Sequence, residues 1–184
     1  SALEKIIERQ KVGNPLDPQV DLGSLVAERQ QKLLTGQLQD AQDKGAKIIA
    51  QTKLNTELKG AFFPPILLTN ITKDMRVWRE EVFGPILPVI PFKTEEEAIA
   101  LANDTVYGLG ARVVTDDIVR AERVASRIEA GSVAINDETR FSPCDPFGGY
   151  KKSGIGRERG IHGLRELCQI KVIQSRSDAQ QFGS

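Results

Sequence analysis

The stretch ILPVIPF (86–92) begins an alternation of strand-like and helix-like segments that decides the fold. A helical pattern over 94–103 follows it, then a strand-like run over 111–114, a second helical pattern over 116–130 and a strand-like run over 132–135. Continuous apolar runs are typical of strands that helices cover on both faces, as in a parallel sheet. The alternation therefore predicts a layered α/β domain.

Both helical patterns in this stretch carry further signals. Thr94 followed by Glu97 is a capping-box pattern, which marks the start of a helix. The second pattern has one apolar stripe that we expect to face a core. The stripe consists of Ile118, Ala121, Ala125 and Ile128.

Upstream of this stretch, apolar residues at helical spacing predict a helix from Ser24 to Lys44 after a short leading helix. Ser24 is placed as its N-cap and Gly45 lies just past its end, where glycine commonly follows a helix. Gly36 weakens the pattern because glycine disfavours helix interiors.

Two strands and a short helix are predicted between this long helix and residue 86. The strand-like runs cover 46–50 and 62–68, and the helical segment covers 72–81. Pro64 and Pro65 cannot donate ladder hydrogen bonds, so we expect that part of the second strand at a sheet edge or end.

The periodic pattern ends after Asn136. Residues 137–153 contain two prolines, two glycines and three aromatic residues, and this aromatic content favours an ordered loop over a disordered one. A short helix is predicted over 158–166. An alternating strand is predicted over 167–173, followed by a frayed tail.

Composition excludes several classes of function. The chain has 184 residues, with 25 basic and 25 acidic side chains, so no overall charge attracts nucleic acid or acidic membranes. Its apolar runs are much shorter than the ~20 residues of a membrane helix, and we expect a soluble protein. The first residues do not resemble a secretory signal, and the two cysteines favour a reducing compartment, so we expect a cytoplasmic location.

Four collinear words are more specific than composition. They are REEVFGP (79–85), ANDTVYGL (102–109), EAGSVAIN (129–136) and PFGGYKKSG (146–154). In this order and at these separations they resemble the aldehyde dehydrogenase superfamily. The resemblance extends from Val12 to Val172 and covers the C-terminal part of the catalytic domain. It implies a three-layer αβα catalytic domain and a parent enzyme that oxidises an aldehyde to a carboxylic acid with NAD or NADP.

The resemblance implies that Glu81 and Phe83 bind the cofactor. In the family, the second glutamate of the EE-x-F-G-P word binds the ribose next to nicotinamide, and the phenylalanine packs beside that sugar. A carboxylate suits this task because it accepts charge-assisted hydrogen bonds from ribose hydroxyls. Without the resemblance, an acidic pair at a helix end indicates only a solvated surface.

The loop before PFGG resembles the wall of the family's aldehyde tunnel. The resemblance implies that Phe147 lies near the reacting carbon and Phe141 further up the channel, with Cys144 and Asp145 facing or adjoining the same tunnel. A lone aromatic residue more often belongs to a core. Both phenylalanines, however, lie in an irregular, proline-flanked segment where core packing is less easily arranged, which favours pocket lining.

No catalytic residue is expected in this chain. The family's reaction needs a thiolate in a G-Q-x-C word that forms a thiohemiacetal and then a thioester, together with a general-base glutamate in an E-L-G-G word. Both words are absent, and in the family both lie upstream of the matched region, as does the dinucleotide-binding domain. Cys144 and Cys168 align with neither word. We therefore expect this chain to be inactive alone.

Two further features have simpler interpretations. The glycines of GIGRERG (154–160) superficially resemble a dinucleotide-binding loop, but the third is one residue late and no strand precedes it. His162 is the single histidine, and no cluster in the sequence reaches the three or four nitrogen and sulfur ligands that a zinc site usually requires. We expect no metal site, and we expect His162 to be a surface or packing residue.

The resemblance divides the chain into a partial catalytic domain, 1–166, and an oligomerisation strand with its tail, 167–184. In the family, this strand joins strands from the N-terminal half, so we expect partners to be that missing half and further copies of the chain, paired through residues 169–174. Two alternatives remain open: a natural non-catalytic interaction or scaffold module on the same fold, and a phosphorylating or CoA-acylating relative. The sequence does not specify the aldehyde, NAD versus NADP, or oligomer size.

Overall fold

The structure is a computed structural model that describes residues 1–55, 57–137 and 142–175. It is α/β, as the alternation predicts, and it divides into two compact units, Ser1–Ala98 and Ile99–Ser184. Each unit is described by itself. None of the helices in the described ranges is long and apolar enough to cross a membrane.

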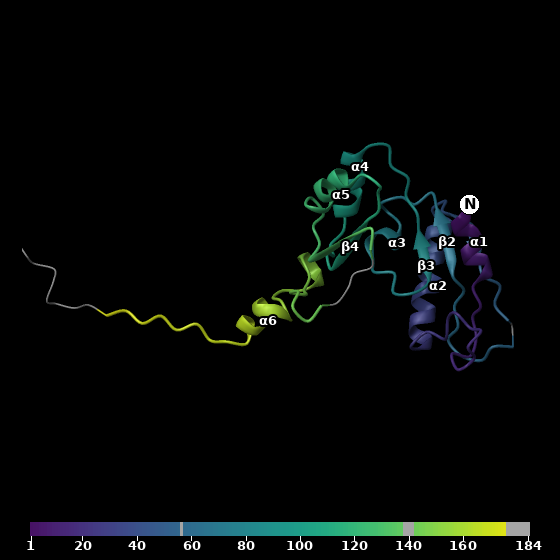
Figure 1. Ribbon diagram of the computed structural model, residues 1–184. Helices are drawn as coiled ribbons and strands as arrows, with labels where there is room; N and C mark the ends of the chain where they lie inside the picture. Colours follow the sequence, from purple (N-terminus) through teal and green to yellow (C-terminus); the bar gives the residue numbers. More distant parts are fainter. Residues whose placement is uncertain (56, 138–141, 176–184) are drawn as a thin grey trace, which may run out of the picture. The chain divides into compact units, whose positions relative to one another are not determined.

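The first unit contains a three-stranded sheet (Figure 1). Strands β1 (Lys47–Gln51), β2 (Ile66–Thr69) and β3 (Ile86–Pro88) lie in the order β1-β2-β3. β1 pairs with β2 antiparallel, whereas β2 and β3 pair in parallel. The second predicted strand is shorter than expected because it begins directly after Pro64 and Pro65, which lack the amide hydrogens that the ladder requires.

Three helices belong to this unit: α1 (Ala2–Arg9), α2 (Glu28–Asp43) and α3 (Arg76–Arg79). The predicted N-cap of α2 at Ser24 is wrong, because the helix begins after Ala27, which makes no side-chain capping bond. The backbone there is held outside the helix, since the Leu25 amide donates to the carbonyl of Ala61 at 2.8 Å. The predicted helix over 72–81 likewise shortens to α3.

The core of the first unit lies between one face of the sheet and helices α2 and α3. Leu67 alternates with Ile66 and Leu68 along β2, so its side chain lies on the opposite face, where it is also buried. Helix α1 contacts β1 and β2. Helices therefore pack on the sheet of this unit, as the layered α/β prediction requires. The buried members of the core cluster are Leu34, Ala41, Ala46, Phe63, Ile66, Leu68, Met75, Val77 and Ile86.

The second unit is built on a β-α-β arrangement. Strands β4 (Gly110–Val113) and β5 (Ser132–Ile135) pair in parallel, and α5 (Ile118–Ala125) connects them and packs on both. The apolar stripe predicted for this helix is only partly buried, since Ala121 is fully buried while Ile118 is 56% exposed. The strands are also less covered than their apolar sequences predict, and every residue of β5 is only half-buried.

Helix α4 (Glu95–Asn103) contains the boundary between the two units. The hydroxyl of Thr94 accepts a hydrogen bond from the Glu97 amide at 3.1 Å, and the Glu97 carboxylate accepts one from the Lys93 amide at 2.7 Å. These bonds satisfy backbone donors at the start of the helix. The predicted capping of this helix is therefore confirmed.

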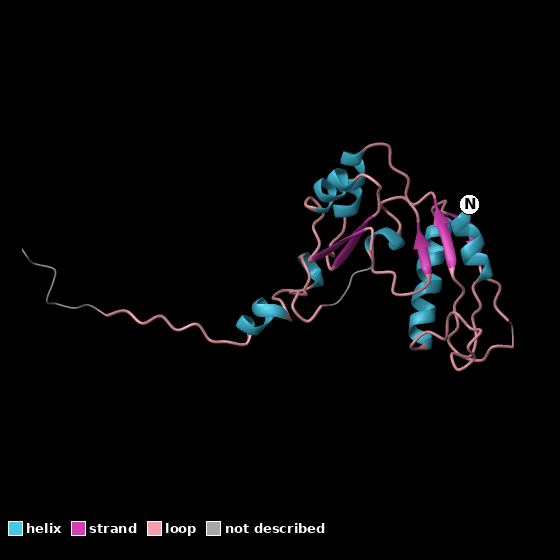
Figure 2. Ribbon diagram, in the orientation of Figure 1, coloured by secondary structure: helices cyan, strands magenta, loops and turns pink. Residues whose placement is uncertain are grey.

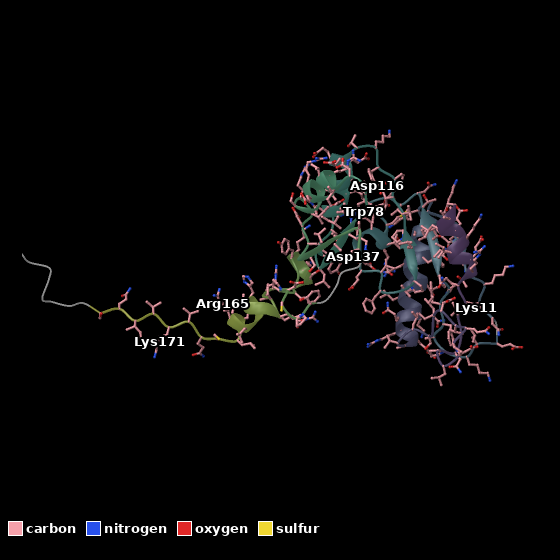
Figure 3. The ribbon with its side chains drawn as sticks, in the orientation of Figure 1. Lys11, Trp78, Asp116, Asp137, Arg165 and Lys171 are labelled. Atoms are coloured by element: carbon pink, nitrogen blue, oxygen red, sulfur yellow. The ribbon has the colours of Figure 1, made fainter. Side chains whose placement is uncertain are left out.

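The chain after β5 is mostly loop (Figure 2). It contains a short 3₁₀ helix, η1 (Lys151–Ser153), and then α6 (Gly160–Glu166). The strand predicted over 167–173 does not form: residues 169–175 are exposed and lie in neither a helix nor a strand. Figure 3 shows Lys171 projecting from this single extended stretch. A strand needs a pairing partner, and none of the described segments supplies one.

Candidate functional site

The acidic segment that follows α3 is anchored by the first of its two glutamates. Arg76 donates two hydrogen bonds to the Glu80 carboxylate, from Nε at 2.8 Å and from Nη2 at 2.9 Å. Gln37 of α2 donates a third from Nε2 at 3.0 Å. The bonds from Arg76, and then that from Gln37, hold the pKa of Glu80 below its ordinary value. Glu80 is therefore a structural carboxylate that joins α3 to α2.

The second glutamate, Glu81, has a different environment. Its side chain is exposed and accepts no hydrogen bond from any of the described residues, whereas its backbone carbonyl accepts one from Gln37 Nε2 at 3.2 Å. Phe83 is 67% exposed, and its carbonyl accepts a hydrogen bond from Gln30 Nε2 at 2.8 Å. The two predicted cofactor residues thus present their side chains to solvent from a backbone that α2 holds.

Gly84 allows this segment to approach α2 closely. A Cβ atom at this position would overlap the side chain of Leu34, which is fully buried in the core. The turn at 83–85 therefore rests directly on the helix, and its position depends on the absence of a side chain.

Phe147 is the predicted tunnel residue that the structure fixes most firmly. It pairs with Glu158 in an isolated antiparallel bridge, with the amide of each residue donating to the carbonyl of the other at 2.8 Å. Its half-buried ring lies 5.5 Å from the Arg159 guanidinium, measured to the ring centroid.

The other predicted tunnel residues are less constrained or lie outside the described part. Cys144 and Asp145 are both exposed, and the Cys144 thiol is free. The loop that carries them is joined to α6 because the Gly160 amide donates to the Pro143 carbonyl at 3.0 Å. Phe141 lies outside the described residues.

A hollow of about 460 Å³ lies beside Phe147 in the second unit. Gly154, Gly156, Arg157 and Glu166 also line it, but Cys144 and Asp145 do not. Of the three predicted tunnel residues that the structure describes, Phe147 alone lines this hollow.

The glycine-rich loop at 154–160 forms much of that wall. Gly154 and Gly156 have φ values of +138° and +74°, which glycine adopts without strain. The Arg157 guanidinium donates to the carbonyls of Gly149 and Gly156 at 3.1 and 2.6 Å. These bonds hold the loop in its conformation, and they explain its glycines without a bound phosphate.

Sequence reasoning missed Gln37, Gln30 and Arg76. The sequence offers one signal for Gln37, which is that it lies at the spacing of the buried stripe of α2, between Leu34 and Ala41. A polar residue at a core position signals a buried hydrogen bond, although the sequence does not reveal its partner.

No metal site was predicted, and the described part of the chain contains no group of three or more histidine, cysteine, aspartate or glutamate residues that could hold an ion. His162 is exposed on α6. Cys144 and Cys168 are both exposed free thiols.

Comparison with known proteins identifies the family to which the chain is similar. The family model described as "Aldehyde dehydrogenase family" matches residues 1–173. Succinate-semialdehyde dehydrogenase [NADP(+)] of Deinococcus radiodurans is 44% identical over 163 residues, which cover 89% of this chain and 34% of the relative. The peroxisomal aminoaldehyde dehydrogenase 1 of Pisum sativum is 41% identical over 182 residues, which cover 98% of this chain and 36% of the relative.

A solved structure gives the same answer for the fold. Betaine aldehyde dehydrogenase from Staphylococcus aureus, in complex with NAD+, superposes with a TM-score of 0.84 at 40% identity, over 90% of this chain and 33% of that one. The chain thus spans about a third of the length of the relatives it matches. The family match and the structural likeness together show that this chain belongs to the aldehyde dehydrogenase family.

Proposed function

We propose that the chain is the C-terminal part of the catalytic domain of an NAD(P)-dependent aldehyde dehydrogenase. The whole enzyme would oxidise an aldehyde to a carboxylic acid through a cysteine thiohemiacetal and thioester. The nucleophilic cysteine, the general-base glutamate and the dinucleotide-binding domain would lie upstream of this chain. The relatives named above support this proposal.

The observation that carries the proposal is the difference between Glu80 and Glu81. Both side chains are exposed, but the Glu80 carboxylate is bound by Arg76 and Gln37, whereas the Glu81 carboxylate has no hydrogen-bond donor among the described residues. A free carboxylate next to the exposed ring of Phe83 fits a ribose, whose hydroxyls are donors and whose ring has an apolar face. Bound NAD(P) would supply the hydride acceptor, and these residues would hold its sugar in place.

The substrate side of the proposal rests on the loop in the second unit. Phe147 would form part of the aldehyde tunnel, since its backbone is fixed by Glu158 and its ring is half-buried. Phe141, Cys144 and Asp145 are proposed to line or adjoin the same tunnel. None of these residues is assigned a proton transfer or a covalent step.

The remaining predictions about the whole protein stay predictions. The division into a catalytic part, 1–166, and an oligomerisation strand with its tail, 167–184, is proposed from the family resemblance. The cytoplasmic location stays a prediction from cysteine usage, and the Pisum sativum relative is named peroxisomal.

An assay of aldehyde-dependent NAD and NADP reduction at 340 nm tests the proposal. Succinate semialdehyde and betaine aldehyde are suitable substrates because relatives are named for them. We expect no turnover by the 184-residue chain and turnover by a longer protein that includes the upstream words. Turnover by the chain alone that Cys144→Ser abolishes would contradict the placement of the nucleophile.

A further inference from the structure

Two adjacent glutamates follow α3, and the local contacts determine which of them faces the ligand. The backbone at Glu80 is extended, with φ −105° and ψ 157°. In extended backbone, successive side chains point to opposite sides. Holding the Glu80 carboxylate against α2 therefore directs the Glu81 side chain away from α2.

Gln37 contacts both glutamates. Its Nε2 donates to the Glu80 carboxylate at 3.0 Å and to the Glu81 carbonyl at 3.2 Å. Arg76 holds the same carboxylate from its own helix. Because one amide group binds the side chain of the first glutamate and the backbone of the second, it fixes the rotation of the segment between them.

We propose that Gln37 is a positioning residue of the cofactor site, which selects Glu81 rather than Glu80 as the ligand-facing carboxylate. The inference rests on the proposed function, in which Glu81 binds the ribose. Gln37 does not touch the cofactor in this proposal. It acts through the backbone and side chain of the glutamate pair.

Packing alone does not explain a glutamine at this position. The Gln37 side chain is fully buried, and its Oε1 accepts no hydrogen bond from the described part of the chain. A buried acceptor without a donor is costly, and an apolar side chain of similar volume would avoid that cost. The two bonds from Nε2 are therefore what the glutamine contributes.

The experiment compares cofactor binding in the whole protein that contains this chain, with NAD+ and NADP+ as the probes. Gln37→Met keeps the volume and removes both donated bonds. Gln37→Glu keeps the shape but places a second carboxylate against Glu80. Gln39→Met is the matched control, because Gln39 lies on the same helix and donates only to the exposed Asp43 at 2.7 Å. Glu81→Gln tests the ligand contact itself.

We expect Gln37→Met to raise the cofactor Kd and KM about tenfold, with kcat at saturating cofactor and the aldehyde KM near their original values. Gln37→Glu should weaken binding further, and Gln39→Met should leave it unchanged. A role in stability alone would change the melting temperature without this separation of KM from kcat. If Gln37→Met does not fold, Arg76→Met removes the other hold on Glu80 and should raise the cofactor Kd in the same way.

The outcomes separate the two proposals. In one outcome, Glu81→Gln weakens cofactor binding while Gln37→Met and Arg76→Met bind the cofactor normally. That result would overturn the positioning role of Gln37 and leave the cofactor role of Glu81 intact. Unchanged binding by Glu81→Gln would overturn that cofactor role and, with it, the positioning role that depends on it.

Discussion

A methyl group added at Gly84 tests whether the turn after the two glutamates packs directly against α2. A Cβ at Gly84 would overlap the buried side chain of Leu34, so Gly84→Ala must displace either the turn or the core. Overpacking of this kind costs about 1 to 3 kcal/mol. We expect the free energy of unfolding of the chain to fall by that amount in urea, followed by the fluorescence of Trp78, the single tryptophan.

Leu34→Ala provides the control for this prediction. It makes room for the new Cβ, so the double variant should lose less stability than the sum of the two single variants. Strictly additive losses would mean that the turn does not rest on Leu34.

The same residues show what sequence could and could not reveal about the site. Glu81 and Phe83 lie in one short word and could be proposed from it. Gln37 could not, because its partners lie 43 and 44 positions away and its role depends on how α2 packs. Which of two identical glutamates is free depends on side-chain contacts that no local pattern encodes.

At the scale of elements, α2 and α3 are joined by carboxylates as well as by apolar packing. Asp40 of α2 forms an ion pair with Lys44 at 2.8 Å and accepts a hydrogen bond from the Arg76 amide at 2.8 Å. These contacts, Lys44 first, lower the pKa of Asp40. Glu80, directly after α3, has a lowered pKa because of Arg76 and Gln37.

These shifts predict that acid weakens the contact between α2 and α3. Both folded pKa values lie below the ordinary values of 3.8 for Asp40 and 4.5 for Glu80, so the unfolded chain binds protons first. Their contribution to stability is therefore present above about pH 4.5 and is lost as pH falls through the folded pKa values. Urea unfolding at a series of pH values measures this loss.

Asp40→Asn and Glu80→Gln should each reduce the pH dependence of unfolding in this acid range. Glu57→Gln is the control, since Glu57 is an exposed residue that belongs to neither helix. An unchanged slope in both helix variants would contradict the assignment of the pH dependence to this contact.

Element boundaries were predictable where the signal is local. The capping box at Thr94 holds because both partners lie within one helical turn. Ser24 fails as an N-cap because a distant contact, from the Leu25 amide to Ala61, keeps the backbone out of the helix. The strand expected near the C-terminus is absent because pairing is a property of two segments.

At the scale of the whole molecule, residues 169–175 are exposed beyond α6. Ile170 is 95% exposed and Val172 is 77% exposed, and two residues apart they would lie on one face of a strand. An unpaired segment with such a face is a template for pairing with another chain. The family resemblance predicts that this segment pairs, either with the proposed N-terminal half of the enzyme or with a second copy of the chain.

The isolated chain should therefore self-associate as its concentration rises, which sedimentation equilibrium measures as an increase in average mass. Ile170→Asp should shift the equilibrium towards the monomer, because the strand would then bury a charge at the contact. Gln169→Asp adds the same charge one residue away, on the opposite face of the strand, and should have a smaller effect. A strictly monomeric mass at high concentration would rule out pairing between copies and leave the proposed N-terminal half of the enzyme as the remaining partner for this segment.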